Sequence, residues 1–115
     1  MKGAIAPLTQ VLEHVERIQG SGVDRQRFLT SAWDQEALIR NLEVLGEATK
    51  RVSEPTRARS RSIPWKQLAG FRDVAIHGYD KLDLDRVWSF IETGLPPLKA
   101  ALRRLLRELG EHEHS

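Results

Sequence analysis

The chain has 115 residues, 40% of them hydrophobic and 30% charged, which is enough for one domain around a single buried core. The formal net charge is only +2, so a uniformly polycationic nucleic-acid binder is excluded and any such binding must come from local patches. Cysteine is absent, which excludes disulfides, thiolate catalysis and cysteine-based metal sites.

No targeting or membrane segment is evident in the sequence. The apolar run in the first ten residues is too short for a signal peptide, and no run of about eighteen apolar residues occurs anywhere. The simplest expectation is a soluble, cytoplasmic protein that does not use a membrane.

The first half of the chain has helical periodicity. Apolar residues recur in threes and fours over residues 8–18, which predicts a first helix ended by a glycine-rich turn. Asp24 then has the side chain to cap a short helical turn through Leu29. Ser31 offers an N-cap for a long helix that reaches about Val52.

The middle of the chain is rich in arginine and serine. Proline stops the long helix, and residues 55–63 read as a loop or a frayed helix. A further helix is expected from about Trp65 to His77, with a bend at Gly70.

The last part of the chain predicts helix again. Asp83 caps it, Gly94 and the prolines after it kink or restart it, and leucines at helical spacing continue toward the end. We therefore expect an all-α, antiparallel bundle of four or five helices over residues 1–110. Residues 111–115 are expected to form a disordered tail and not a metal site, and His14 is isolated on the first helix.

Residues 72–79 are the most informative stretch for function. Arg72, Asp73 and His77 would share one face of a helix, and Asp73 can reach His77 across one turn. Gly78 favours the end of a helix, so Tyr79 would project just beyond it. These residues form a compact polar cluster at a helix terminus.

The chemistry of this cluster suits cleavage of RNA. Histidine exchanges protons near neutral pH, and arginine is a permanent cation that holds phosphate through two parallel donors. His77 would take the proton of a ribose 2′-hydroxyl, which attacks the adjacent phosphorus, while Arg72 stabilises the added charge. Asp73 would orient His77. This reaction requires neither a metal nor a cofactor.

A purely structural interpretation of the same residues stays open. An aspartate and a histidine four residues apart on a helix are often an ordinary surface hydrogen bond. His77 would then neutralise the C-terminal helix dipole, and Arg72 would be a salt-bridge partner for Glu47.

Two further sets of residues raise the same question of function or structure. The basic stretch between the two central helices is a candidate guide for the RNA backbone, or else a solvated loop; its members are Arg57, Arg59 and Arg61. The tryptophans lie on or beside apolar stripes, so we expect core or dimer anchors more than base-stacking platforms; they are Trp33, Trp65 and Trp88.

Four segments in the same order resemble the HepT family of minimal HEPN-domain proteins. Its signature of arginine, four residues, histidine, one residue and tyrosine matches residues 72–79. Residues 41–48 look like its long-helix segment, residues 63–70 like its lead-in and residues 83–96 like its last part. The resemblance covers roughly residues 8 to 107, with an aspartate at position 73 where many members carry asparagine.

The resemblance implies a function and two protein partners. It implies an endoribonuclease toxin that forms a two-fold homodimer, in which Arg72, Asp73 and His77 of both chains make one composite cleft. The other partner would be an MNT-type nucleotidyltransferase antitoxin, which silences the toxin by transferring AMP from ATP onto Tyr79. The alternative is a non-catalytic helical module that binds this nucleotidyltransferase and is modified by it.

Overall fold

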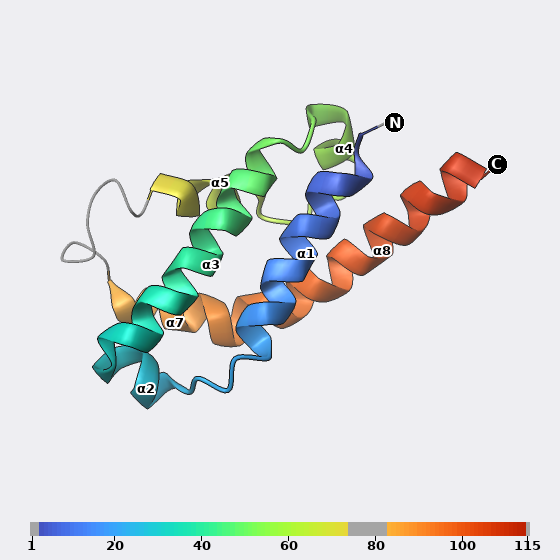
Figure 1. The fold of residues 1–115 in the computed structure, drawn as a ribbon. Coiled ribbons are helices and arrows are strands. Elements are labelled where there is room, and N and C mark those ends of the chain that lie inside the picture. The colour runs from blue at the N-terminus through green and yellow to red at the C-terminus, as the bar shows by residue number, and fades with distance from the viewer. Residues whose placement is uncertain (1–2, 74–82, 115) are drawn as a thin grey trace.

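The computed structural model describes residues 3–73 and 83–114, the last four of them by their backbone alone. All its regular elements are helical (Figure 1). They are α1 (Ile5–Gln19), α2 (Arg25–Thr30), α3 (Ala32–Lys50), α4 (Glu54–Ala58), α5 (Trp65–Gly70), η1 (Phe71–Asp73), α7 (Leu84–Ser89), η3 (Phe90–Gly94) and α8 (Leu95–His114). No strand occurs in these residues, so the predicted all-α class is confirmed.

The core lies between the long helices α1, α3 and α8. α1 and α3 run antiparallel side by side, and α8 crosses the other side of α1 (Figure 1). The apolar stripe predicted over residues 8–18 is buried in this core. The largest fully buried side chains include Phe28, Leu8, Leu38, Ile39, Leu42, Leu45, Leu68, Leu95, Leu102, Leu105 and Leu109. Within the described ranges, no helix is long and apolar enough to cross a bilayer.

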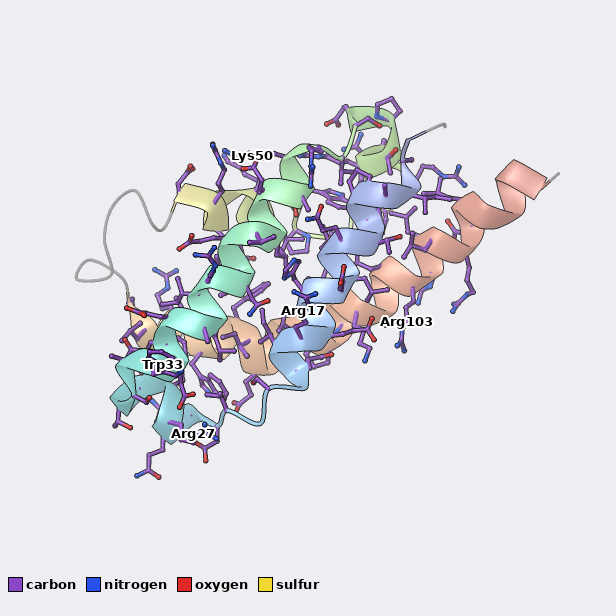
Figure 2. The ribbon with its side chains drawn as sticks, in the orientation of Figure 1. Arg17, Arg27, Trp33, Lys50 and Arg103 are labelled. Carbon is purple, nitrogen blue, oxygen red and sulfur yellow. The ribbon has the colours of Figure 1, made fainter. Side chains whose placement is uncertain are left out.

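The starts of α2 and α3 follow the sequence prediction. Asp24 Oδ1 accepts a hydrogen bond from the backbone N–H of Arg27 at 2.8 Å, and Ser31 Oγ accepts one from that of Asp34 at 3.2 Å. Each cap satisfies a backbone donor that the first turn leaves free. The guanidinium of Arg27, which Figure 2 labels, also pairs with Asp34 at 3.1 Å, and this pair joins the two helices.

The segment between α3 and α5 is more ordered than the sequence suggested. α3 ends at Lys50, and a short helix, α4, forms where a loop or frayed helix was expected. Ser53 caps α4, because its Oγ accepts from the N–H of Thr56 at 3.4 Å. Pro55 lies in the first turn, where its missing N–H costs no hydrogen bond.

The expected motif helix starts where predicted but changes form early. Trp65 begins α5, and its indole Nε1 donates to the carbonyls of Arg57 and Ser60 at 3.2 and 3.0 Å. After Gly70 the backbone tightens into the 3₁₀ turn η1. The bend expected at Gly70 therefore takes the form of a change from α-helix to 3₁₀-helix.

The end of the chain restarts its helix without a break. α7 passes into the π-helical turn η3 and then into α8, so Gly94 marks a change of winding. A Cβ on Gly94 would lie 2.8 Å from the ring of Phe90, which explains a glycine there. The backbone of α8 continues through His114, so helix extends into the segment for which we predicted a tail over residues 111–115.

The tryptophans separate into two groups. Trp65 and Trp88 are 8% exposed and belong to the core, and the ring centroid of Trp88 lies 5.6 Å from that of Phe28. Trp33, near the start of α3, is 84% exposed (Figure 2). It does not contribute to the core of a single chain.

Candidate active site

Arg72 and Asp73 lie on η1 and face the C-terminal half of α3. The Nε of Arg72 forms an ion pair with Oε2 of Glu47. One turn further along α3 lies Lys50, which Figure 2 labels, and its Nζ is 3.8 Å from Oδ1 of Asp73. All four side chains are about 40–50% exposed. The two motif residues are thus held at the surface by two ion pairs to one helix.

Gly46 allows η1 to come this close to α3. A Cβ built on Gly46 would lie 2.6 Å from the backbone nitrogen of Arg72 and 2.8 Å from the carbonyl oxygen of Leu68. Both contacts are to backbone, which cannot rotate out of the way as a side chain can. A glycine at this point of α3 therefore sets how deeply the backbone of Arg72 sits against the helix.

A hollow of about 340 Å³ opens where these elements meet. We call it the α3 hollow, and its lining residues are Glu43, Val44, Glu47 and Arg72. Its surface is mostly apolar, and a guanidinium and two carboxyl groups border it at the motif arginine.

The two carboxyl groups of the α3 hollow differ. The carboxylate of Glu47 pairs with Arg72, whereas Oε1 of Glu43 is buried and has no hydrogen-bond partner in the described part of the chain. Burial raises the pKa of Glu43 above its usual 4.5, and the nearby charge of Arg40 opposes that rise. The sequence analysis did not single out Glu43. The available signal was its spacing, because Glu43 and Glu47 are four residues apart and share one face of α3.

The pair between Arg72 and Glu47 is the contact that the purely structural interpretation predicted, and this contact is confirmed. Its strength decides what it means for function. Ion pairs between side chains as exposed as these contribute about 0.2–1 kcal/mol. A phosphate that binds an arginine through two charge-assisted hydrogen bonds competes readily with such a pair. The ion pair therefore holds Arg72 in place but is weak enough for a phosphate to replace it.

His77 and Tyr79 lie outside the described residues, and so does the expected contact between Asp73 and His77. These assignments stay predictions.

The three arginines of the basic stretch occupy different environments. The guanidinium of Arg57 donates to the carbonyl oxygens of Val52 at 3.1 Å and Thr49 at 2.9 Å, so it closes the C-terminal end of α3. Arg59 and Arg61 are exposed, at the end of α4 and in the turn beyond it. Arg57 therefore has a structural role whether or not it also contacts RNA.

His14 has a partner that the sequence did not reveal. It is only 8% exposed on α1, and its Nδ1 lies 2.8 Å from Oδ1 of Asn41 on α3. This hydrogen bond links the two helices in the core. Among the residues that the structure describes, no three histidine, aspartate or glutamate side chains are grouped to hold a metal ion.

The described part of the chain is all-helical, with a half-exposed arginine beside a surface hollow. Sequence comparison identifies the family to which this chain belongs. The chain belongs to the HepT-like ribonuclease family: the model described as "Ribonuclease HepT-like" matches residues 9–105. The family that the motif and its flanking segments indicated is thereby confirmed.

Several archaeal proteins are similar to this chain. A Methanocaldococcus jannaschii protein named "Gamma-glutamylcyclotransferase and putative RNase" is 33% identical over 94% of this chain, which spans 50% of that protein. A "Putative RNase" of the same organism is 31% identical, with 94% of this chain and 92% of the relative covered. A "Probable ribonuclease HepT" of Thermococcus cleftensis is 35% identical over 68% of this chain and 71% of its own length. No solved structure matches.

Proposed function

We propose that this protein is a metal-independent endoribonuclease that acts in the cytoplasm as the toxin of a toxin-antitoxin pair. The observation that carries the proposal is the position of Arg72, held at the α3 hollow by a weak, exposed ion pair in a chain of the HepT-like family. An arginine in such a position is available to a phosphodiester. The names of all three relatives described above agree with this chemistry, because two contain the words putative RNase and the third contains the word ribonuclease.

The proposed reaction uses three residues of the motif. His77 removes the proton of a ribose 2′-hydroxyl, the oxygen attacks the adjacent phosphorus, and the bond to the 5′-oxygen breaks as His77 of the partner subunit donates a proton to that oxygen. Arg72 stabilises the negative charge that develops on the phosphate oxygens. Asp73 orients His77, and Lys50 at 3.8 Å from Asp73 adds positive charge beside the same phosphate.

We propose that two copies of the chain assemble as a two-fold dimer with a composite cleft. The support in this chain is Trp33, a large aromatic side chain that is 84% exposed. Tryptophan is enriched in protein interfaces because its ring buries a large apolar area when a partner covers it. Trp33→Ala should therefore shift the mass measured by light scattering from dimer toward monomer, and an unchanged dimer would remove Trp33 from the interface.

The proposed antitoxin is an MNT-type nucleotidyltransferase that transfers AMP to Tyr79. An AMP group two residues from His77 would add bulk and a negative phosphodiester beside the residues that bind RNA phosphate. The competing proposal is a helical module that binds this enzyme and is modified by it but cuts no RNA. The pair between Arg72 and Glu47 is the observation that favours this second reading, because it gives Arg72 a structural partner.

Cleavage of RNA in the presence of excess chelator separates the two readings. The parent protein should cut RNA, His77→Ala should not, and His112→Ala is the matched control for loss of a histidine outside the motif. Arg72→Lys should be severely impaired, since a point charge does not replace a bidentate fork. Cleavage by His77→Ala at the parental rate, or loss of the parental activity with chelator, would contradict the metal-free histidine mechanism.

A further inference from the structure

A mostly apolar cavity of about 290 Å³ opens where the turn before α5 meets η3 and α8. We call it the α5 slot, and its apolar walls are formed by Ile63, Pro64, Phe90, Pro97, Leu98 and Ala101. Ser62 and Gln67, both exposed, add a hydroxyl and a carboxamide to the lining. Sites for small molecules have volumes of about 300–1,000 Å³, so the α5 slot suits one flat ring system and not a larger ligand.

Phe90 is held from two directions as a wall of the α5 slot. The centroid of its ring lies 5.0 Å from that of Phe71 on η1. On the other side the backbone of Gly94 comes so close that a Cβ there would lie 2.8 Å from the ring of Phe90. The slot is therefore built into the packing of η1 against η3 and does not depend on a freely rotating side chain.

The contact between Phe71 and Phe90 also connects the α5 slot to the motif arginine. Phe71 immediately precedes Arg72 on η1, and Gln67 lies on α5 just before this turn. α5 has six residues, so it is about 9 Å long. An RNA strand with a phosphate at Arg72 therefore needs to pass only over this short helix to bring a flanking base to the slot.

Positive charge borders the α5 slot. Arg61 and Lys66 are exposed, and they are the chain neighbours of the lining residues Ser62 and Gln67. Apolar walls with cations at the rim match a nucleotide of a single strand, whose base has flat apolar faces and whose phosphate is negative. An apolar side chain of another protein would use the walls of the slot but not these cations.

We propose that the α5 slot binds an unpaired adenine base of the RNA, next to the phosphate at Arg72. This inference rests on the proposed ribonuclease function, because it takes RNA as the ligand. The base packs its faces against the apolar walls. The carboxamide of Gln67 donates an N–H to N7 of adenine and accepts a hydrogen bond from its 6-amino group. Gln67 is then a residue that determines specificity, while Arg61 and Lys66 contact phosphates and carry no sequence information.

The test measures the Kd of the protein for two RNA decamers made of 2′-O-methyl nucleotides, one all adenosine and one all uridine. These RNAs are not cut, and each presents the same base in every register. The parent should bind the adenosine decamer at least about fivefold more tightly. Ala101→Leu fills part of the slot and should reduce the affinity for the adenosine decamer to that for the uridine decamer. Ala100→Leu, an exposed position of α8 outside the slot, is the matched control and should be parental.

A second variant tests the reading of the base. Gln67→Ala removes the carboxamide from an exposed position and keeps the apolar walls, so the preference for adenosine over uridine should fall to less than about twofold. Gln26→Ala, the same change at an exposed position of α2, should keep the parental preference. Urea unfolding checks the fold of each variant. If Ala101→Leu is unfolded, the result for Gln67→Ala decides.

Two results would overturn the assignment of the α5 slot. A parental Kd of Ala101→Leu for the adenosine decamer would leave the slot to an apolar side chain of a protein partner. Equal weakening of both decamers by this variant would exclude selection of adenine.

Cleavage of unmodified RNA separates this inference from the function on which it rests. If the parent cuts RNA but Ala101→Leu leaves the preference for adenosine unchanged, the ribonuclease stands and the slot fails. If the parent prefers adenosine, loses this preference in Ala101→Leu and cuts no RNA, the ribonuclease proposal fails and the slot remains as a binding site. If the parent binds neither decamer, the proposed slot is wrong.

Discussion

The guanidinium of Arg72 and the carboxylate of Glu47 form an ion pair that joins the 3₁₀ turn η1 to the long helix α3. Both side chains remain about half exposed, at 48% and 52%. Water therefore screens the pair, which limits its contribution to about 1 kcal/mol at most. The pair holds Arg72 at the α3 hollow.

Removing the charge of Glu47 should strengthen RNA binding. In Glu47→Gln an incoming phosphate no longer competes with a carboxylate for Arg72, so the Kd for RNA should fall by up to about fivefold. The measurement uses RNA with 2′-O-methyl groups, which lacks the attacking hydroxyl and is bound without being cut. Glu36→Gln serves as the control for loss of one negative charge from α3. Weaker binding by Glu47→Gln than by this control would mean that the pair is needed to position Arg72.

Gly46→Ala should destabilise the fold and displace η1. Alanine usually stabilises the interior of a helix relative to glycine, but here its Cβ would lie within 2.6–2.8 Å of the backbone of Arg72 and Leu68. The clash should dominate and lower the free energy of unfolding by about 1–3 kcal/mol. The matched control is Gly110→Ala in α8, where a Cβ would meet nothing within 4 Å and stability should rise by about 0.5–1 kcal/mol. Urea unfolding measures both, and a stabilised Gly46→Ala would show that η1 can move away at little cost.

Arg57 should matter for stability and Arg61 should not. Arg57→Gln removes the charged donor that bonds two carbonyls at the C-terminal end of α3, which should cost about 1 kcal/mol of unfolding free energy. Arg61→Gln changes an exposed side chain in a turn and should stay within about 0.5 kcal/mol of the parent. Equal stability of the two variants in urea would contradict the capping role of Arg57. Because Arg61→Gln should fold normally, a change in its Kd for RNA would measure the electrostatic contribution of Arg61 to RNA binding.

The raised pKa of Glu43 predicts a pH dependence of stability. Glu43 binds its proton more tightly in the folded chain than in the unfolded chain, where its pKa is near 4.5. Its stabilising contribution is therefore fully present below that value and is lost as the pH rises through the higher pKa of the folded state. Glu43→Gln cannot ionise, so relative to the parent it should gain stability as the pH rises past about 4.5 and through the higher pKa of the folded state. A difference between the two unfolding free energies that stays constant over this range would contradict the raised pKa.

Local sequence signals predicted most of the fold. The caps at Asp24 and Ser31 and the apolar stripe over residues 8–18 were correct because each depends on neighbours a few residues away. The winding of the chain was harder to predict. The 3₁₀ turn after Gly70 and the π turn before Leu95 both depend on close contacts, one of them between α3 and η1.

The candidate site also depends on contacts between segments that are distant in the sequence. The spacing of residues 72–79 identified Arg72 and Asp73, but the α3 hollow forms only when two segments about thirty residues apart in sequence meet. Glu43 acquires its unusual environment from that meeting, and Arg57 acquires its structural role by folding back onto α3. A single sequence does not reveal which charged side chains will be taken up by such contacts.

Tyr79 should be the residue that receives AMP. It is the only tyrosine of the chain, and Gly78 before it favours the end of a helix, so its hydroxyl would be accessible to a second enzyme. Incubation with the proposed nucleotidyltransferase, ATP and magnesium should add mass in units of AMP to the peptide that contains Tyr79, the magnesium serving that enzyme's phosphoryl transfer.

Tyr79→Phe tests both the acceptor and the regulatory meaning of the modification. Phenylalanine fills nearly the same space but offers no nucleophile, so the variant should keep much of its cleavage of RNA and escape silencing when the nucleotidyltransferase and ATP are added. Ser89→Ala, which removes an exposed hydroxyl elsewhere in the chain, is the control and should be silenced like the parent. Mass added to Tyr79→Phe would show that another group is the acceptor. An additional negative phosphodiester beside His77 should repel the substrate phosphate, so the modified parent protein is expected to lose its cleavage of RNA. A modified parent protein that still cuts RNA at its full rate would show that the AMP group does not block the site.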